Sequence, residues 1–294
     1  MAATDPADDL GLFGPESVTW RVHQEPVLLV AGLRSLYLQA LHPRAVAGVA
    51  QNSGYKTDPW GRLVRTATYV ATVVYGSTGQ AREAGRRLRG LHARMRAVDP
   101  ATGETFRIDE PDLLRWVHVT EVESFVTTAR RAGAALTDDD VDTYYTEQRL
   151  AAELVGLDPA TVPGTAAQVA DYYRQVRPEL RLTRDSAETM VFLTAPPMPW
   201  GPSMPWKMSL PLRLAFELGP PRWAYLGIAG TAIGLLPGWA RRLYGGLGLP
   251  TTDLSAELSV RGLRLALNAV PRRYVEGPIY QAAMARAARL EAAV

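Results

Sequence analysis

The sequence predicts an all-α fold in one helical domain. Apolar residues recur at intervals of three and four along most of the 294-residue chain, which is the spacing of an amphipathic helix. No strands alternate with helices and no internal repeat is present, so an α/β architecture is not indicated. Hydrophobic residues make up 47% and charged residues 21%, as in ordinary globular proteins. We expect a flexible N-terminal lead at residues 1–15, followed by the domain at 16–294.

Caps, prolines and glycines set the expected helix boundaries. Pro26 divides the first helical segment, and the His42-Pro43 pair ends it, with His42 as a capping residue. Gly76 closes the helix that starts near Arg62, Ser77 starts the next one, and a strand is expected at 105–108. The expected helices run over 17–41, from 43, 62–75, 77–98, 111–131, from Thr137, from Thr165, 185–193, 254–269 and 278–292.

Two C-terminal segments differ from the rest. Residues 195–211 are rich in proline and tryptophan, so they form a loop, and Trp200 and Trp206 within it could border the entrance of a binding site. Trp223 to Ala240 holds 18 residues without a charge, interrupted by Pro237. That length is borderline for a membrane span, and we expect a buried or surface-associated hairpin with peripheral membrane contact through 223–240.

Composition excludes several classes of function. The net charge is only +2, which gives no indication of nucleic-acid binding. The chain has no cysteine, so disulfides and cysteine ligands to a metal are excluded. The acidic N-terminus lacks the basic and apolar regions of a signal peptide, so we expect a cytoplasmic protein. The common nucleotide, hydrolase and zinc-protease motifs do not occur.

Two of the four histidines, His92 and His118, lie within helical patterns. His92 lies at the edge of an apolar stripe, and His118 is one helical turn from Glu121, with which it could form a hydrogen bond. Either histidine could be a neutral core residue. A non-haem site of His92, His118 and Glu121 or Glu123 is a second option. Haem is a third, and it fits more easily because one nitrogen ligand suffices and the chain is rich in arginine.

Five segments occur in an order that resembles a known family. They read HPRAVAGV, DPWGRLVRTATYVATVVYGS, GLHARMRAV, DEPDLLRWVHVTEVESF and LTDDDVDTYYTE. The family is a bacterial one, once described as a domain of unknown function, and is related to the rubber oxygenases (latex clearing proteins) and to the membrane-bound oxygenase of mycophenolic acid biosynthesis. The resemblance runs from about Val27 to about Tyr173, roughly half the chain.

This resemblance implies a globin-related helical bundle that holds haem b, with His92 as the proximal iron ligand. The distal motif of the rubber oxygenases is arginine, two residues, lysine and threonine, and it corresponds here to Arg62, Arg65 and Thr66. Arg65 therefore replaces the lysine. The glutamate proposed as their base would fall near 42–50, where this chain has no carboxylate. Both departures point to a reaction other than rubber cleavage.

We therefore expect a haem-dependent oxygenase or peroxidase-like enzyme that uses dioxygen or peroxide on a hydrophobic small molecule. Arg62, Arg65 and Thr66 would line the distal pocket, Tyr69 would border it, and His118 would contact the haem. Two alternatives remain. One is a haem carrier or sensor with iron bound by both His92 and His118. The other is a helical scaffold without a cofactor.

Overall fold

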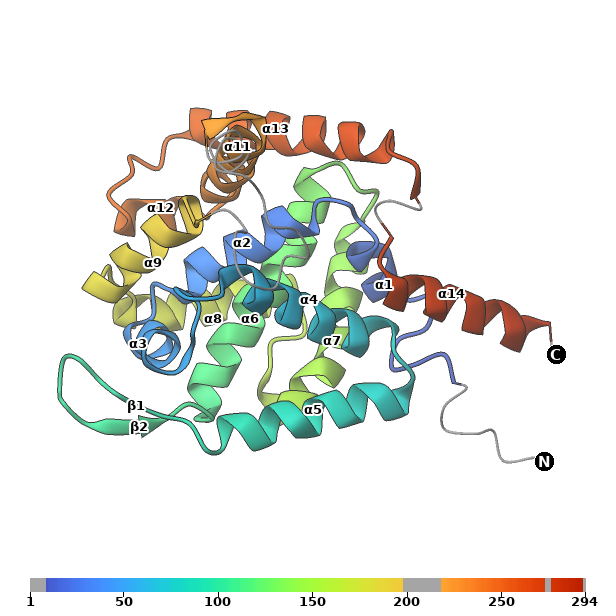
Figure 1. Cartoon of the computed structure of the whole chain (residues 1–294), viewed down its shortest axis with the longest axis horizontal. Coiled ribbons are helices and arrows are strands. Elements are labelled where there is room, and N and C mark those ends of the chain that lie inside the picture. Colours follow the sequence, from blue (N-terminus) through green and yellow to red (C-terminus); the bar gives the residue numbers. More distant parts are fainter. Residues whose placement is uncertain (1–8, 198–217, 273–275, 293–294) are drawn as a thin grey trace, which may run out of the picture.

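A computed structural model describes residues 9–197, 218–272 and 276–292 of the chain. Within these residues it contains thirteen α-helices and two short strands, so the predicted all-α class is confirmed. Figure 1 shows the helices surrounding α2 and α6, with α5 and the strands at one edge and α13 at the opposite edge. The elements are α1 Val18–His23, α2 Leu28–Gln39, α3 Pro43–Asn52, α4 Pro59–Tyr75, α5 Thr78–His92, β1 Arg96–Val98, β2 Thr105–Arg107, α6 Pro111–Arg131, α7 Asp138–Val155, α8 Ala166–Val176, α9 Arg184–Thr194, α11 Pro220–Gly234, α12 Gly238–Leu243, α13 Pro250–Asn268 and α14 Pro278–Glu291.

Most predicted helix starts are confirmed by their caps. The first helical segment is divided into α1 and α2 around Pro26, and the ring of His42 accepts a hydrogen bond from the amide of Ala45 at the start of α3. The hydroxyls of Ser77, Thr137 and Thr165 cap α5, α7 and α8. Each satisfies a backbone donor that would otherwise lack a partner in the first helical turn.

The predicted helix over 77–98 is too long. The structure ends α5 at His92, and the next residues form β1, which pairs antiparallel with β2. Ala97 lies opposite Phe106, and both are buried beside Leu113, whereas the residues flanking them in each strand are exposed. This burial pattern has the two-residue period of a strand, and it overrode the apolar spacing that suggested a helix. The strand expected at 105–108 is confirmed as β2.

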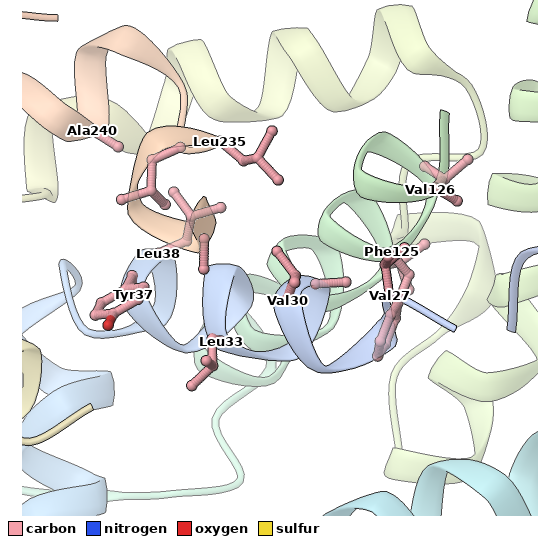
Figure 2. Packing of buried hydrophobic residues seen from close by; sticks show 14 of the residues in the cluster. Val27, Val30, Leu33, Tyr37, Leu38, Phe125, Val126, Leu235 and Ala240 are labelled. Atoms are coloured by element: carbon pink, nitrogen blue, oxygen red, sulfur yellow. The ribbon is translucent and has the colours of Figure 1, made fainter. Parts of the chain in front are cut away.

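The main core forms where α2 crosses α6, and the segment joining α11 to α12 closes over it. Figure 2 shows Val30 and Leu38 of α2 near Phe125 of α6 and Leu235. These side chains are less than a tenth exposed. Burial of this size supplies the largest favourable contribution to folding, so α2 and α6 are the fixed frame on which the other helices are placed.

An ion pair lies inside this core. The guanidinium of Arg34 on α2 donates to both carboxylate oxygens of Glu123 on α6, at 2.5 and 2.9 Å, and also to the Ser124 hydroxyl and the Leu235 carbonyl. The Tyr173 hydroxyl donates to the same carboxylate. Since a buried charge is tolerated only when it is paired and hydrogen-bonded, this network fixes how α2, α6 and α8 meet.

The uncharged segment 223–240 is not one continuous helix. It covers most of α11 and the start of α12, and Pro237 lies in the break between them. Among the described residues, no helix combines the length and the apolar character needed to cross a membrane. Trp200, Trp206 and most of the expected loop at 195–211 lie outside the described residues.

Candidate functional site

Three helices carry the predicted site residues. Arg62, Arg65, Thr66 and Tyr69 lie on α4, His92 is the last residue of α5, and His118 lies on α6. A tight turn at Gly76 reverses the chain between α4 and α5, which then pack against each other (Figure 1). Neither of these two helices packs closely along α6, whose main partners are α2 and α7.

His92 has an unsatisfied buried nitrogen. Its Nδ1 atom is buried and has no hydrogen-bond partner among the described residues. Burial lowers the pKa of the imidazole, and the carboxylate of Asp109 opposes that effect only in part. A neutral imidazole is the form that binds a metal ion. His92 therefore has the charge state and the free nitrogen that a ligand needs.

His118 lies on α6 in a mainly apolar environment. One side of the ring faces a narrow void lined by Val119, Val122, Tyr145, Val162, Pro163 and Val169, too small for a water molecule. The ring has no hydrogen bond to any described residue. Burial lowers the pKa of His118 to about 4, so this imidazole is also neutral at pH 7.

Glu121 follows His118 by one turn and has no cationic partner in the described parts of the chain. Burial raises the pKa of its carboxyl group to about 7. The side chains of His118 and Glu121 do not form the hydrogen bond expected from the sequence, in the part of the chain that the structure describes. An unpaired carboxyl group that titrates near neutrality can accept and release protons, which makes Glu121 a candidate for acid–base chemistry.

Charges on α5 and α6 both influence the pKa of Tyr69, which lies on α4. Its hydroxyl is buried and has no hydrogen-bond partner in the described structure. Burial raises its pKa to about 12, the nearby charge of Glu121 on α6 adds to the rise, and Arg89 on α5 opposes it. Tyr69 therefore lies near both α5 and α6 and keeps its proton, so it is an unused hydrogen-bond donor.

The distal-motif residues differ in their exposure. Arg62 is partly buried, and its guanidinium lies 5.9 Å from the centre of the Tyr55 ring. Burial is also the main cause of its lowered pKa. Arg65 is exposed and pairs with Asp58 at 3.1 Å, and Thr66 is exposed as well. Of the three, Arg62 is the most enclosed by protein.

The proposed non-haem metal set does not form. In the described residues, no group of three or more histidine, aspartate or glutamate side chains is arranged to hold a metal ion. Glu123, one of the two carboxylates considered for this set, is bound to Arg34 inside the core. Residues 121 and 123 lie about 200° apart around a helix, so the two alternative carboxylates face different neighbours, and Glu123 is taken up by the core ion pair.

Comparison with protein families identifies the relationship. Residues 20–269 match the family described as "ER-bound oxygenase mpaB/B'/Rubber oxygenase, catalytic domain". The chain belongs to this family. The match includes every predicted site residue and extends beyond the segments that carried the resemblance. No curated protein and no solved structure matches the chain significantly. Membership of the family supports an oxygenase.

Sequence reasoning did not foresee the state of Glu121. It considered this residue as a partner of His118 or of a metal, not as an isolated acid. The sequence held no signal that separates it from Glu123: the helical neighbours of Glu121 (117, 118, 124 and 125) and those of Glu123 (119, 120, 126 and 127) alike contain no lysine or arginine. The difference arises from another helix, because α2 brings Arg34 to Glu123, whereas Glu121 is desolvated without a cationic partner among the described residues.

Proposed function

We propose that this protein is a haem b-dependent oxygenase that acts on a hydrophobic small molecule. The observation that carries the proposal is the neutral imidazole of His92, which has no hydrogen-bond partner in the described part of the chain, in a protein that belongs to an oxygenase family. His92 would hold the iron. When bound, haem b would supply the redox-active centre for dioxygen or peroxide, which no side chain of a cysteine-free protein provides.

The residues fit such a group in their chemistry. His92 ends α5 three residues after Arg89, and His118 precedes Glu121 on α6 by the same interval. Residues three apart share a helical face, and Tyr69 is coupled electrostatically to both Arg89 and Glu121. This coupling supports a space between α4, α5 and α6 that His92 borders, whereas the void beside His118 is lined by residues of α6, α7 and 162–169. A haem needs such an apolar space with one nitrogen ligand.

The neighbouring side chains would bind and orient the substrate. Arg62 offers a fixed positive charge for a haem propionate or a substrate carboxylate. The protonated hydroxyl of Tyr69 can donate a hydrogen bond to a substrate oxygen. Glu121 can accept a proton at its carboxylate near neutral pH, a role for which residues 42–50 offer no carboxylate. Arg65 and Thr66, both exposed, would lie at the outer border of the pocket.

The absorption spectrum of protein expressed with added haem precursor tests this proposal. We expect a Soret band that His92→Ala removes while the far-UV circular dichroism is unchanged. The matched control is His42→Asn, which keeps a helix-capping side chain at a histidine outside the site and should retain the band. A colourless wild-type protein with full helical signal would contradict haem binding.

A carrier or sensor is the second candidate, because His118 is also neutral and has no hydrogen bond to any residue that the structure describes. If both histidines bind the iron, His118→Ala should change the iron from low spin to high spin in electron paramagnetic resonance. For an oxygenase with an open coordination position, the same variant should leave the spin state unchanged. The two outcomes separate a carrier from an enzyme without requiring the substrate.

A further inference from the structure

Within the described residues, the outer face of α13 is an apolar surface that no other element covers. Leu254, Leu258 and Leu265 are 63%, 61% and 71% exposed. At 100° per residue these three positions fall within a 40° arc of the helix, on the side opposite the buried Ala256 and Val260. We call them the α13 leucine stripe. An amphipathic helix normally places leucines inward, so this helix has apolar side chains on both faces.

Exposed large apolar side chains are concentrated between residues 218 and 265. Among the described residues, six of the eight most exposed large apolar side chains lie between 218 and 265. Besides the stripe they are Leu218, Trp223 and Leu247. Trp223 lies on α11, which packs against α13, and Leu247 is 80% exposed in a glycine-rich turn before it. Figure 1 shows α13 along the edge of the molecule opposite α5, the helix that ends at His92.

The charge of residues 218–272 indicates which kind of partner fits this surface. Residues 218–272 contain six arginines and two carboxylates, a net charge of 6 − 2 = +4, whereas the whole chain carries +2. Arg242, Arg261 and Arg272 are exposed there. Of the six arginines, Arg241 is buried and Arg264 pairs with Glu25, so the exposed ones carry the positive charge of this face, and a second copy would bring a like-charged face against it. Leucines, an exposed tryptophan and arginines together match the acyl boundary and the headgroups of an anionic lipid surface.

We propose that the α13 leucine stripe docks on the surface of a bilayer that contains anionic lipids. Within 223–240, the segment expected to contact a membrane, Ala229, Ala232 and Ala240 are buried, and Trp223 is the large side chain that remains highly exposed. The docking is peripheral: the leucines enter the headgroup and acyl boundary while Ala256 and Val260 stay in the core. It requires no cofactor, so it is independent of the proposed function.

Flotation of the full-length protein with vesicles tests the proposal. The probes are vesicles of phosphatidylcholine alone and of phosphatidylcholine with phosphatidylglycerol. Wild-type protein should float with the anionic vesicles and less with neutral ones, and added salt should weaken the binding. Replacing the three stripe leucines by serine should lower the partition coefficient at least about tenfold, because each buried leucine contributes strongly to insertion. The matched control, Leu150→Ser with Leu182→Ser, replaces exposed leucines elsewhere and should bind like wild type.

The absence of cysteine allows a site-specific readout. A polarity-sensitive dye on Leu258→Cys should shift to the blue when anionic vesicles are added, whereas the same dye on Leu150→Cys should not. The proposal is overturned if wild-type protein does not float, or if the serine variant floats equally well. It is also overturned if the stripe variant only converts a dimer to a monomer in light scattering, because the face would then bind a second copy.

Discussion

Glu121 and Glu123 lie two residues apart on α6, and only Glu123 has a cationic partner among the described residues. Glu123 faces α2, where Arg34 binds it. Glu121 faces the side on which Tyr69 lies, and its charge contributes to the raised pKa of the Tyr69 hydroxyl. The helical angle between them assigns one carboxylate to the stability of the core and leaves the other available for chemistry. Neither role follows from residue type.

Arg34→Met should destabilise the protein strongly. The substitution leaves the Glu123 carboxylate buried without its cation, and breaking such a pair costs about 3–5 kcal/mol. Urea denaturation followed by circular dichroism measures the loss in the free energy of unfolding. The double variant Arg34→Met with Glu123→Leu should recover much of it, since neither charge of this pair then remains buried. A single variant within about 1 kcal/mol of wild type would show that the pair contributes little.

Glu121→Gln should change how stability depends on pH. The folded pKa of about 7 exceeds the ordinary value of 4.5, so the folded state retains the proton that the unfolded state has lost. Wild-type stability therefore falls as pH rises from about 4.5 to 7, by at most about 3 kcal/mol. Glutamine carries no charge and removes this loss.

The variant should therefore equal wild type near pH 4.5 and be more stable at pH 8, as measured by urea denaturation across this range without added haem. The difference in the free energy of unfolding between the two proteins reports on Glu121 alone, because both proteins contain all the other titrating groups. Parallel stability curves across this range would mean that Glu121 is paired or hydrated in solution.

Arg65→Ala should change stability by less than about 1 kcal/mol. Arg65 and Asp58 are 69% and 48% exposed in their side chains, and such surface pairs contribute little. A change in the Soret band or in ligand binding to the haem-loaded variant would then report on the pocket, not on folding. Arg62→Ala is the comparison, since Arg62 is partly buried beside Tyr55. Unfolding of Arg65→Ala at denaturant concentrations where the wild-type protein is still folded would contradict the surface role.

Gly85→Ala should loosen the packing of α5 on α7. A methyl group at Gly85 would lie 2.8 Å from the carbonyl oxygen of Leu154 and 3.0 Å from its Cβ, so the helices must separate. We expect a loss of about 1–3 kcal/mol in thermal or urea denaturation. Gly90→Ala, on the same helix with open space around it, should instead stabilise by up to about 1 kcal/mol. Equal effects of the two variants would refute the close contact at Gly85.

Local chemistry in the sequence determined most of the helix boundaries. Ser77, Thr137 and Thr165 start their helices because their side chains satisfy the first backbone donors, which depends only on nearby residues. The residue at which α5 ends could not be predicted from nearby residues. Residues 96–98 become a strand because β2, nine residues away, supplies partners for their backbone groups.

The sequence by itself determined the all-α class, the family and the candidate histidines, since periodicity, caps and ordered motifs are local properties of the chain. Only the tertiary structure decided which carboxylate on α6 is paired, that the Tyr69 hydroxyl and His92 Nδ1 have no partner among the described residues, and that α13 presents leucines outward. The physical reason is that desolvation and ion pairing depend on what other helices bring to each side chain. A single helix specifies its own faces, and the neighbouring helices decide which of those faces are buried, charged or free to bind.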